Sequence, residues 1–292
     1  MFVIIGILVV FGSVIGGFLM EHGELMVLVQ PAEYVIILGA AIGTVLIANP
    51  PAVLMGMIRS ALGVLKGSPY SKKLYLEALK ALYEVFQYVR KNGLAKLEAD
   101  IEKPAESELF KSYAWLMKDH YTLDFVCDTF RMTMTGHVQP FELDQMLEHD
   151  LEVHHHENEE PAHSLQTVAD ALPGLGIVAA VLGVVITMGS LGGPPEEIGH
   201  KVAAALVGTF LGILFCYGLV SPLASSIQKG NKQRLEFLTC LKGALVASVK
   251  GAAPILAVEH ARRLAPPHVR PSFAELEAAC KGAGAAPKQE AA

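Results

Sequence analysis

Long apolar stretches alternate with polar segments along this chain, and four of them are long enough to cross a membrane. These runs are residues 2–20, 34–57, 172–189 and 202–221. An α-helix rises 1.5 Å per residue, so a bilayer core of about 30 Å requires about 20 apolar residues. Each run has roughly that length. The pattern therefore predicts four transmembrane helices.

Lysine and arginine avoid two of the three segments that connect these runs. Residues 59–168 contain 12 of them and residues 227–292 contain 10, whereas residues 21–33 contain none and the third connection contributes Lys201 alone. Cytoplasmic loops of membrane proteins carry an excess of Lys and Arg. We therefore expect both basic pieces and both chain ends in the cytoplasm, and the two short loops outside.

The polar pieces have helical spacing, and no strand-like alternation longer than four residues occurs in them. Ser71 is a candidate N-cap for a helix that Gly93 ends, because apolar residues fall on one face between them. Further helices are expected at 94–101, 107–118, 119–135, 140–160 and 228–264, the last interrupted near Pro254, and after a capping box at Ser272–Glu275. The predicted fold is an all-α polytopic membrane protein with a helical cytoplasmic domain. Its predicted parts are residues 1–58 (first two spans), 59–168 (cytoplasmic domain), 169–226 (last two spans) and 227–292 (cytoplasmic helix, with a disordered tail from 282).

Composition and motifs exclude several function classes. Apolar residues make up 52% of the chain, and the net charge of −6 gives no basic surface for nucleic acid. The chain has no phosphate-binding loop, H-E-x-x-H or G-x-S-x-G motif, so an enzyme is the least expected class. The histidines of segment 149–163 could bind a transition metal, but their glutamate-rich surroundings favour a solvated surface, and no metal is predicted.

Small residues recur at four-residue spacing within the spans. The rows are Gly12/Gly16, Gly39/Gly43, Ala179/Gly183/Thr187 and Ala204/Gly208/Gly212/Cys216. Residues at i and i+4 share a helix face, so each row is a smooth strip on which another helix can lie closely. Two interpretations remain open at this point: packing within one chain, or an oligomer whose inner wall is formed by spans three and four.

Polar groups in the spans are few. Thr187, Thr209 and Tyr217 are the notable ones, and no Asp, Glu, Lys, Arg or His is expected at depth. An ion path normally needs an ionisable group there, so a partner would have to supply the carboxylate. A threonine in a helix can instead bond its own backbone. Pro173 and Pro222 frame the last two spans, where helix punctuation at a first turn and at a helix end is the simplest interpretation.

Three stretches resemble the MotA family of flagellar motor stator subunits. They are ADALPGLGIVAAVLGVVITMG (169–189), LVGTFLGILFCYGLVSPLA (206–224) and VEHARRLAPPHVRPSFAELE (258–277). The order of spans and cytoplasmic pieces is similar as well, over essentially the whole chain. The histidine-rich segment and the tail match nothing in the family.

The resemblance implies a partner-dependent motor in the bacterial inner membrane. Such a protein forms a ring, thought to be a homo-pentamer, around the membrane helices of MotB, which supplies an aspartate and a peptidoglycan anchor. Ion flow would turn the ring against the rotor protein FliG. No cofactor is implied beyond the coupling ion.

The family's functional positions map onto individual residues of this chain. Arg90 and Glu98 match charged residues that meet the rotor, and Pro173 and Pro222 match prolines that couple ion flow to movement. Thr209 matches a hydroxyl that faces the ion path, and Tyr217 resembles a family position near that path. Thr187 is expected among the ion-path residues as well. Ala180 resembles the proton-using members, because sodium-using relatives tend to carry threonine there. Protons are therefore the expected ion, and sodium is less expected.

Two other functions remain open on sequence grounds. The first is an energiser similar to ExbB or TolQ, although such chains typically have three spans and another loop layout. The second is a passive membrane scaffold or channel, which would tolerate changes at Pro173 and Thr209.

Overall fold

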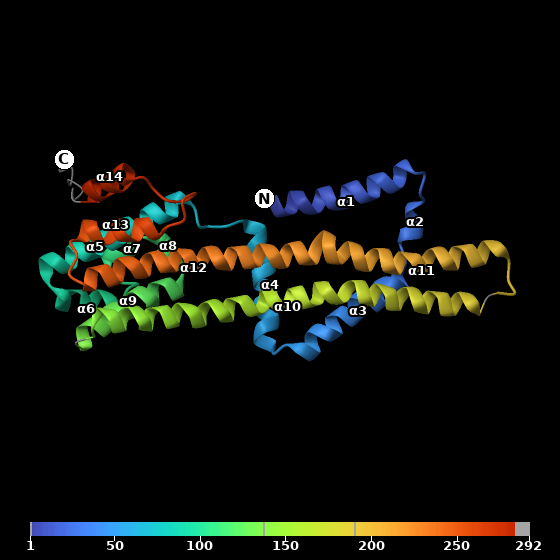
Figure 1. Ribbon diagram of the computed structural model, residues 1–292, viewed down its shortest axis with the longest axis horizontal. Coiled ribbons are helices and arrows are strands. Elements are labelled where there is room, and N and C mark those ends of the chain that lie inside the picture. Colours follow the sequence, from blue (N-terminus) through green and yellow to red (C-terminus); the bar gives the residue numbers. More distant parts are fainter. Residues whose placement is uncertain (1, 137, 190, 284–292) are drawn as a thin grey trace. The chain divides into compact units, whose positions relative to one another are not determined.

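The computed structural model describes residues 2–136, 138–189 and 191–283, and the regular structure in these ranges is helical throughout (Figure 1). The helices are α1 (Phe2–Met20), α2 (Leu25–Leu28), α3 (Pro31–Ala48), α4 (Pro51–Lys66), α5 (Lys72–Asn92), α6 (Leu94–Glu102), α7 (Glu108–Lys111), α8 (Ala114–Lys118), α9 (His120–Thr135), α10 (Pro140–Met188), α11 (Pro195–Phe215), the π-helix η1 (Cys216–Val220), α12 (Ser221–Val249), α13 (Pro254–Leu264) and α14 (Phe273–Ala283). Of the predicted disordered tail, residues 284–292 lie outside the described ranges, whereas Gly282 belongs to α14.

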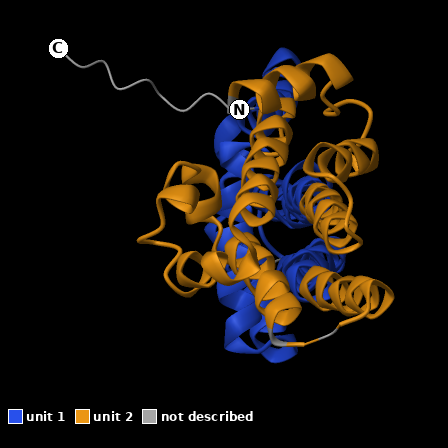
Figure 2. Cartoon of the chain, turned by 90° about the vertical axis from the view of Figure 1, so that its left-hand side faces the viewer, with its two compact units in different colours: residues 1–68, 156–231 blue, residues 69–155, 232–292 orange. Residues whose placement is uncertain are grey.

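The chain forms two compact units, each built from two separate stretches of sequence. Unit 1 contains residues 1–68 and 156–231, and unit 2 contains residues 69–155 and 232–292 (Figure 2). The long helices α10 and α12 each contribute residues to both units.

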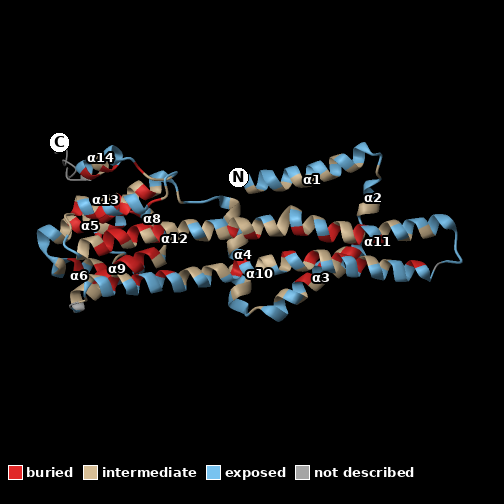
Figure 3. Cartoon of the chain, in the orientation of Figure 1, coloured by how far each residue is buried: buried red, intermediate tan, exposed pale blue. Residues whose placement is uncertain are grey.

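The prediction of four membrane spans is confirmed. Four helical stretches in the described residues are long and apolar enough to cross a membrane: Phe2–Met20, Leu25–Ala48, Pro140–Met188 and Pro195–Val249. Their outer faces stay open in the single chain, and α1 buries no residue at all (Figure 3). Large apolar side chains on these faces suit contact with lipid or with neighbouring subunits.

The second span differs from its predicted range of 34–57. It ends at Ala48, because Pro50 disfavours helical backbone at Asn49, which is extended with φ −128° and ψ 141°. The Asn49 side chain donates from Nδ2 to the carbonyl of Val45 at 3.0 Å and so closes the helix end. The apolar residues up to Met57 belong instead to the separate helix α4.

The third span is part of a much longer helix than predicted. The expected helix at 140–160 and the expected span at 172–189 are joined in the 49-residue helix α10, with Pro161 and Pro173 inside it. The prediction that Pro173 lies in a first turn is therefore wrong. A proline inside a helix removes one backbone hydrogen bond, yet the chain remains helical through both positions.

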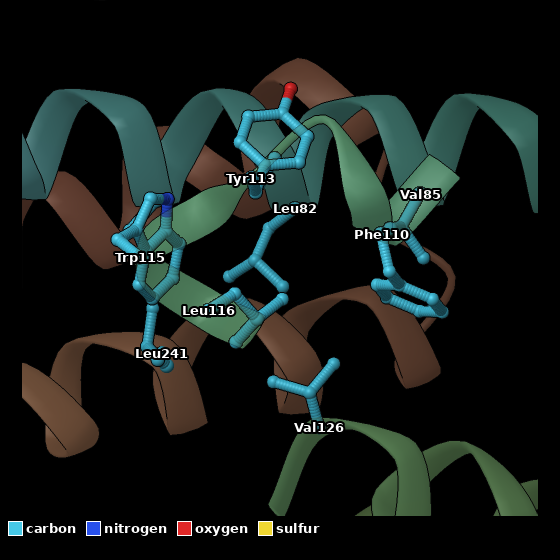
Figure 4. Close-up of a pocket in the computed structure, with 10 residues that line it drawn as sticks. Leu82, Val85, Phe110, Tyr113, Trp115, Leu116, Val126 and Leu241 are labelled. Atoms are coloured by element: carbon cyan, nitrogen blue, oxygen red, sulfur yellow. The ribbon is translucent and has the colours of Figure 1, made fainter. Parts of the chain in front are cut away.

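Unit 2 packs helices around an apolar core centred on α5. Tyr75, Leu82 and Phe86 of α5 are buried there with Phe110 and Leu241. Figure 4 shows part of this core, where side chains from α5, α8, α9 and α12 point toward one another. The amphipathic spacing that predicted α5 thus identifies the face that is buried.

Predicted helix ends in unit 2 are largely confirmed. The Ser71 hydroxyl accepts from the backbone N–H of Leu74 at 3.4 Å, and Gly93 adopts φ +83° after α5. The capping box forms as expected: the backbone N–H of Ser272 donates to Glu275 Oε2 at 2.6 Å, and the N–H of Glu275 donates to Ser272 Oγ at 3.2 Å.

Candidate ion path and coupling residues

The last two spans touch along a seam of small residues. A Cβ placed on Gly183 of α10 would lie 2.6 Å from the Cβ of Ala205 on α11. A Cβ on Gly176 would lie 2.8 Å from the carbonyl oxygen of Gly208. No side chain fits between the two backbones at these points, so the helices approach as closely as small residues allow.

The small-residue rows differ in whether they contact another helix of the same chain. Ala179 and Gly208 lie in the seam, so the rows of α10 and α11 serve packing within the chain. The rows on α1 and α3 behave differently, because a Cβ on Gly12, Gly16 or Gly39 would meet no atom of the described chain within 4 Å. Those strips remain open for contacts with other molecules.

Glu33 enters this seam, contrary to the prediction for an external loop. It lies in the first turn of α3 and is only 7% exposed. A Cβ on Gly208 would lie 2.5 Å from its Oε2 atom. The predicted external loop, which extended to residue 33, is therefore too long, because α3 already begins at Pro31. Pro31 carried the missed signal, because proline is favoured at the first position of a helix and sets its start before Glu33.

The candidate ion-path residues do not all occupy one place. Ala180 and Thr209 border the seam: the backbone nitrogen of Ala180 would lie 3.2 Å from a Cβ on Gly208, and the Cα of Thr209 would lie 3.3 Å from one on Gly176. Thr187 is buried, and its hydroxyl donates to the carbonyl of Gly183 at 2.8 Å. Its hydroxyl thus serves its own helix, the simpler of the two interpretations.

A π turn precedes Pro222 where the fourth span was expected to end. Residues Cys216–Val220 form η1, and α12 continues directly from Ser221. Pro222 thus lies in the first turn of α12, and helical structure runs on past it. Its missing N–H and its ring disturb the hydrogen bonds of the preceding turn, which is where the π turn lies. Tyr217 projects from this turn and is 69% exposed.

Polar side chains join α10 to α12 beside the two prolines. The hydroxyl of Ser221 donates to Gln166 Oε1 at 3.3 Å, and Gln166 Nε2 donates to Asp170 Oδ1 at 2.8 Å. The hydrogen bonds end at Asp170, an exposed residue that lies three positions before Pro173. The sequence did not predict the contact between Gln166 and Ser221, because partners 55 residues apart leave no local pattern.

The two predicted rotor-contact charges lie on the surface of unit 2. Arg90 occupies the last turn of α5, and Glu98 belongs to α6 after the turn at Gly93. Both are exposed, and neither forms an ion pair within the part of the chain that the structure describes. Other charges of unit 2 are paired, such as Arg234 with Asp119 at 3.0 Å.

A groove of about 320 Å³ lies beside Arg90. Phe86 and Val89 form one wall, and Ser248 with the segment 251–254, at the start of α13, forms the other. Arg90 therefore lines a partly apolar hollow. A surface of this kind offers a partner both a charge and a contact area.

The histidine-rich segment shows no metal-binding arrangement. Among the described residues no three His, Cys, Asp or Glu side chains come together as a metal-binding group. His154 instead stacks on Tyr121, with ring centroids 3.4 Å apart, and Arg234 lies 5.7 Å from the centroid of the same tyrosine ring. His154 thus contributes to packing in unit 2.

Comparisons with known proteins match almost the entire chain. Residues 4–93 match the family described as Motility protein A N-terminal, and residues 118–238 match the MotA/TolQ/ExbB proton channel family. The chain is 42% identical over 277 residues to Motility protein A of Escherichia coli K12, covering 95% of this chain and 94% of that protein.

Two solved structures share the fold. The structure of C. jejuni MotAB superposes with a TM-score of 0.74 at 18% identity, covering 91% of this chain and 95% of that chain. The flagellar MotAB stator complex from Bacillus subtilis gives a TM-score of 0.69 at 22% identity, covering 88% of this chain and 92% of that chain.

Proposed function

Since this chain belongs to the motility protein A branch of the MotA/TolQ/ExbB proton channel family, it is a stator subunit of the flagellar motor and not an enzyme, and we propose how it works. It assembles as a ring, a homo-pentamer, around MotB. Proton flow along the MotA–MotB interface turns the ring, and the ring drives the rotor protein FliG.

The proposed orientation follows the distribution of charge. The four-span protein lies in the inner membrane with both chain ends in the cytoplasm. Residues 1–58 and 169–226 form the membrane part, and residues 59–168 and 227–292 face the cytoplasm. This arrangement brings the charged surface of unit 2 to the side where the rotor lies.

One observation carries the proposal that MotB supplies the ion-binding aspartate. The segments of α10 and α11 that meet at the seam contain no Asp, Glu, His, Lys or Arg, neither in residues 171–195 nor in residues 202–228. Ala180 and Thr209 border the seam without a carboxylate of their own helices. The two helices that form this wall thus offer a proton no acidic group of their own, and we propose that the ion-binding aspartate comes from the partner.

Open helix faces support assembly around such a partner. A Cβ added at any of the glycines in the strips Gly12/Gly16 and Gly39/Gly43 would meet no atom of the described chain within 4 Å. Small residues on membrane helices let neighbouring backbones approach closely. We assign these strips to contacts between subunits of the ring.

Coupling is proposed to depend on the two prolines. Pro173 lies inside α10, and Pro222 follows the π turn in the helix that continues from α11. Each proline removes a backbone hydrogen bond at a point where the helix can bend. Protonation of the MotB aspartate would then change the direction of these helices at the two prolines.

The rotor contact is proposed to involve Arg90 and Glu98. A proton crossing 100 mV releases about 2.3 kcal/mol, whereas an exposed charge pair contributes about 0–1 kcal/mol. Contacts of that strength can form and break within each step. Because both side chains are exposed and unpaired within the described chain, they are available to rotor charges.

Deletion of the gene tests the proposed function. We expect cells with filaments that do not rotate, and rotation restored by the wild-type gene. We also expect MotB to co-purify with the tagged protein. Normal rotation after deletion, in a strain without a second stator, would contradict the proposal, and a defect in outer-membrane transport would favour an energiser.

A further inference from the structure

Glu33 is a buried acid of unit 1 that the proposed function leaves without a role. Its side chain is 7% exposed, and Oε2 has no hydrogen-bond partner among the described residues. The carboxylate lies against Gly208 of α11, where a Cβ would come within 2.5 Å of Oε2. Ala179 and Ala180 of α10 border the same point.

Within the described ranges, the elements beside this carboxylate offer it no charge. Helix α2 consists of Leu25–Leu28 and has no ionisable residue, and the parts of α10 and α11 at the seam have none either. Tyr34, next to Glu33 on α3, directs its hydroxyl to the carbonyl of Leu28 at 3.5 Å. A carboxylate with a buried, unpartnered oxygen is costly as an anion, so Glu33 is stable here when it holds a proton or when a donor from outside the chain reaches Oε2.

The position of Glu33 relates it to the proposed ion path. Gly208 directly precedes Thr209, and Ala180 borders the same glycine. The carboxylate that α3 brings into the seam therefore meets α10 and α11 at the level of two candidate path residues. In the proposed orientation, the first turn of α3 is the end of the helix nearest the external side.

A role in helix capping does not account for this placement. A glutamate in the first turn stabilises the positive end of a helix, but an exposed side chain does so equally well. Nor does the packing of α3 require an acid opposite a glycine. Acidic groups within membrane helices usually belong to ion pathways.

We propose that Glu33 is a proton-relay residue at the outer end of the path, an inference that rests on the proposed function. Its carboxylate takes a proton from hydronium on the external side, forming an O–H bond and releasing water. It then gives this proton through water to the MotB carboxylate and returns to the anion. Each cycle moves one proton inward and leaves Glu33 unchanged.

The test measures the speed contributed by each stator unit, from the stepwise increases as units are added after induction. Cells lacking the native gene carry the wild-type gene or the Glu33→Gln, Glu33→Asp or Glu24→Gln variant. Small beads on the filament keep the load low, so that proton transfer takes up the largest share of the time of each stator cycle. Speed per unit is recorded at several external pH values.

We expect Glu33→Gln to lower the speed per unit several-fold and to abolish its dependence on external pH. Glu33→Asp keeps an acid, so it should retain most of the speed per unit and most of the dependence on external pH. Glu24, an exposed glutamate of the same external segment, serves as the control, and Glu24→Gln should behave as wild type. A purely structural role would reduce the number of units but leave the speed of each one unchanged.

Two results would overturn the relay, and they differ from failure of the proposed function. Glu33→Gln units with wild-type speed and pH dependence would exclude it, as would fewer units of normal speed. If the wild-type gene itself fails to restore rotation, the result contradicts the proposed stator function and not the relay alone.

Discussion

Gly212 of α11 lies against the backbone of Leu172 on α10: a Cβ on Gly212 would come within 2.5 Å of the Leu172 carbonyl oxygen. A backbone oxygen cannot turn away as a flexible side chain can. The contact therefore fixes the distance between the last two spans just before Pro173.

Gly212→Ala should disturb this contact. Overpacking of a tight interface typically costs about 1–3 kcal/mol, so we expect a lower melting temperature of the protein in detergent and slower rotation. Gly174→Ala is the matched control, because a Cβ there meets nothing within 4 Å. Equal melting temperatures for the two variants would contradict the close approach.

Thr209 and Thr187 should respond differently to the same replacement. Valine keeps the shape of threonine and removes the hydroxyl. Thr187 uses its hydroxyl on the carbonyl of Gly183, so Thr187→Val should rotate nearly normally. Thr209→Val should slow rotation if its hydroxyl borders the path. The measurement is tethered-cell speed at matched protein levels, and equal speeds of the two variants would remove Thr209 from the path.

Hydropathy predicts the number of spans because burial in lipid constrains every residue of a span. It does not predict where a helix stops when the signals conflict. At Asn49–Pro50 the apolar run continues through a proline pair, but the helix α3 ends before it and α4 begins within it. At Pro161 and Pro173 the reverse occurs, since α10 continues through both. Neighbouring helices decide between these outcomes, and one sequence does not contain their positions.

For the same reason, the sequence predicts some residues of the candidate site and not others. The small residues Ala179 and Gly208 are visible as a periodic pattern, and the structure brings them together. The burial of Glu33 depends on α11 approaching α3, which no local pattern encodes. The roles of Arg90 and Pro222 came from family resemblance and stay predictions.

Charge reversal at Arg90 should weaken torque. Arg90→Glu replaces an exposed, unpaired cation with an anion that repels an acidic rotor surface. We expect slower swimming and partial recovery when an acidic FliG residue is reversed in turn. Lys73→Glu is the control, since Lys73 is an exposed lysine near the other end of α5. Failure of every rotor reversal to rescue Arg90→Glu would argue against direct electrostatic contact.

Acid should destabilise the protein through Glu259. Hydrogen bonds from Arg262 and Arg263 lower the pKa of Glu259 from 4.5 to about 2. Because the folded-state pKa lies below the unfolded value, this stabilisation is complete above that unfolded value and is lost as the pH falls from about 5 toward 2.

Thermal unfolding of the purified protein across this range measures the effect. Glu259→Gln should lower the melting temperature at neutral pH and flatten its decline in acid. Glu108→Gln is the control, because Glu108 is exposed and forms no ion pair within the described residues. A Glu259→Gln curve parallel to wild type at every pH would show that this cluster does not set the acid sensitivity.

The most direct test of the central claim is the ion dependence of rotation. Cells whose only stator contains this chain are tethered, and their speed is followed while a protonophore collapses the proton gradient or potassium replaces external sodium. We predict that the protonophore stops rotation and that sodium removal leaves the speed unchanged. Rotation that follows sodium and persists without a proton gradient would contradict proton coupling.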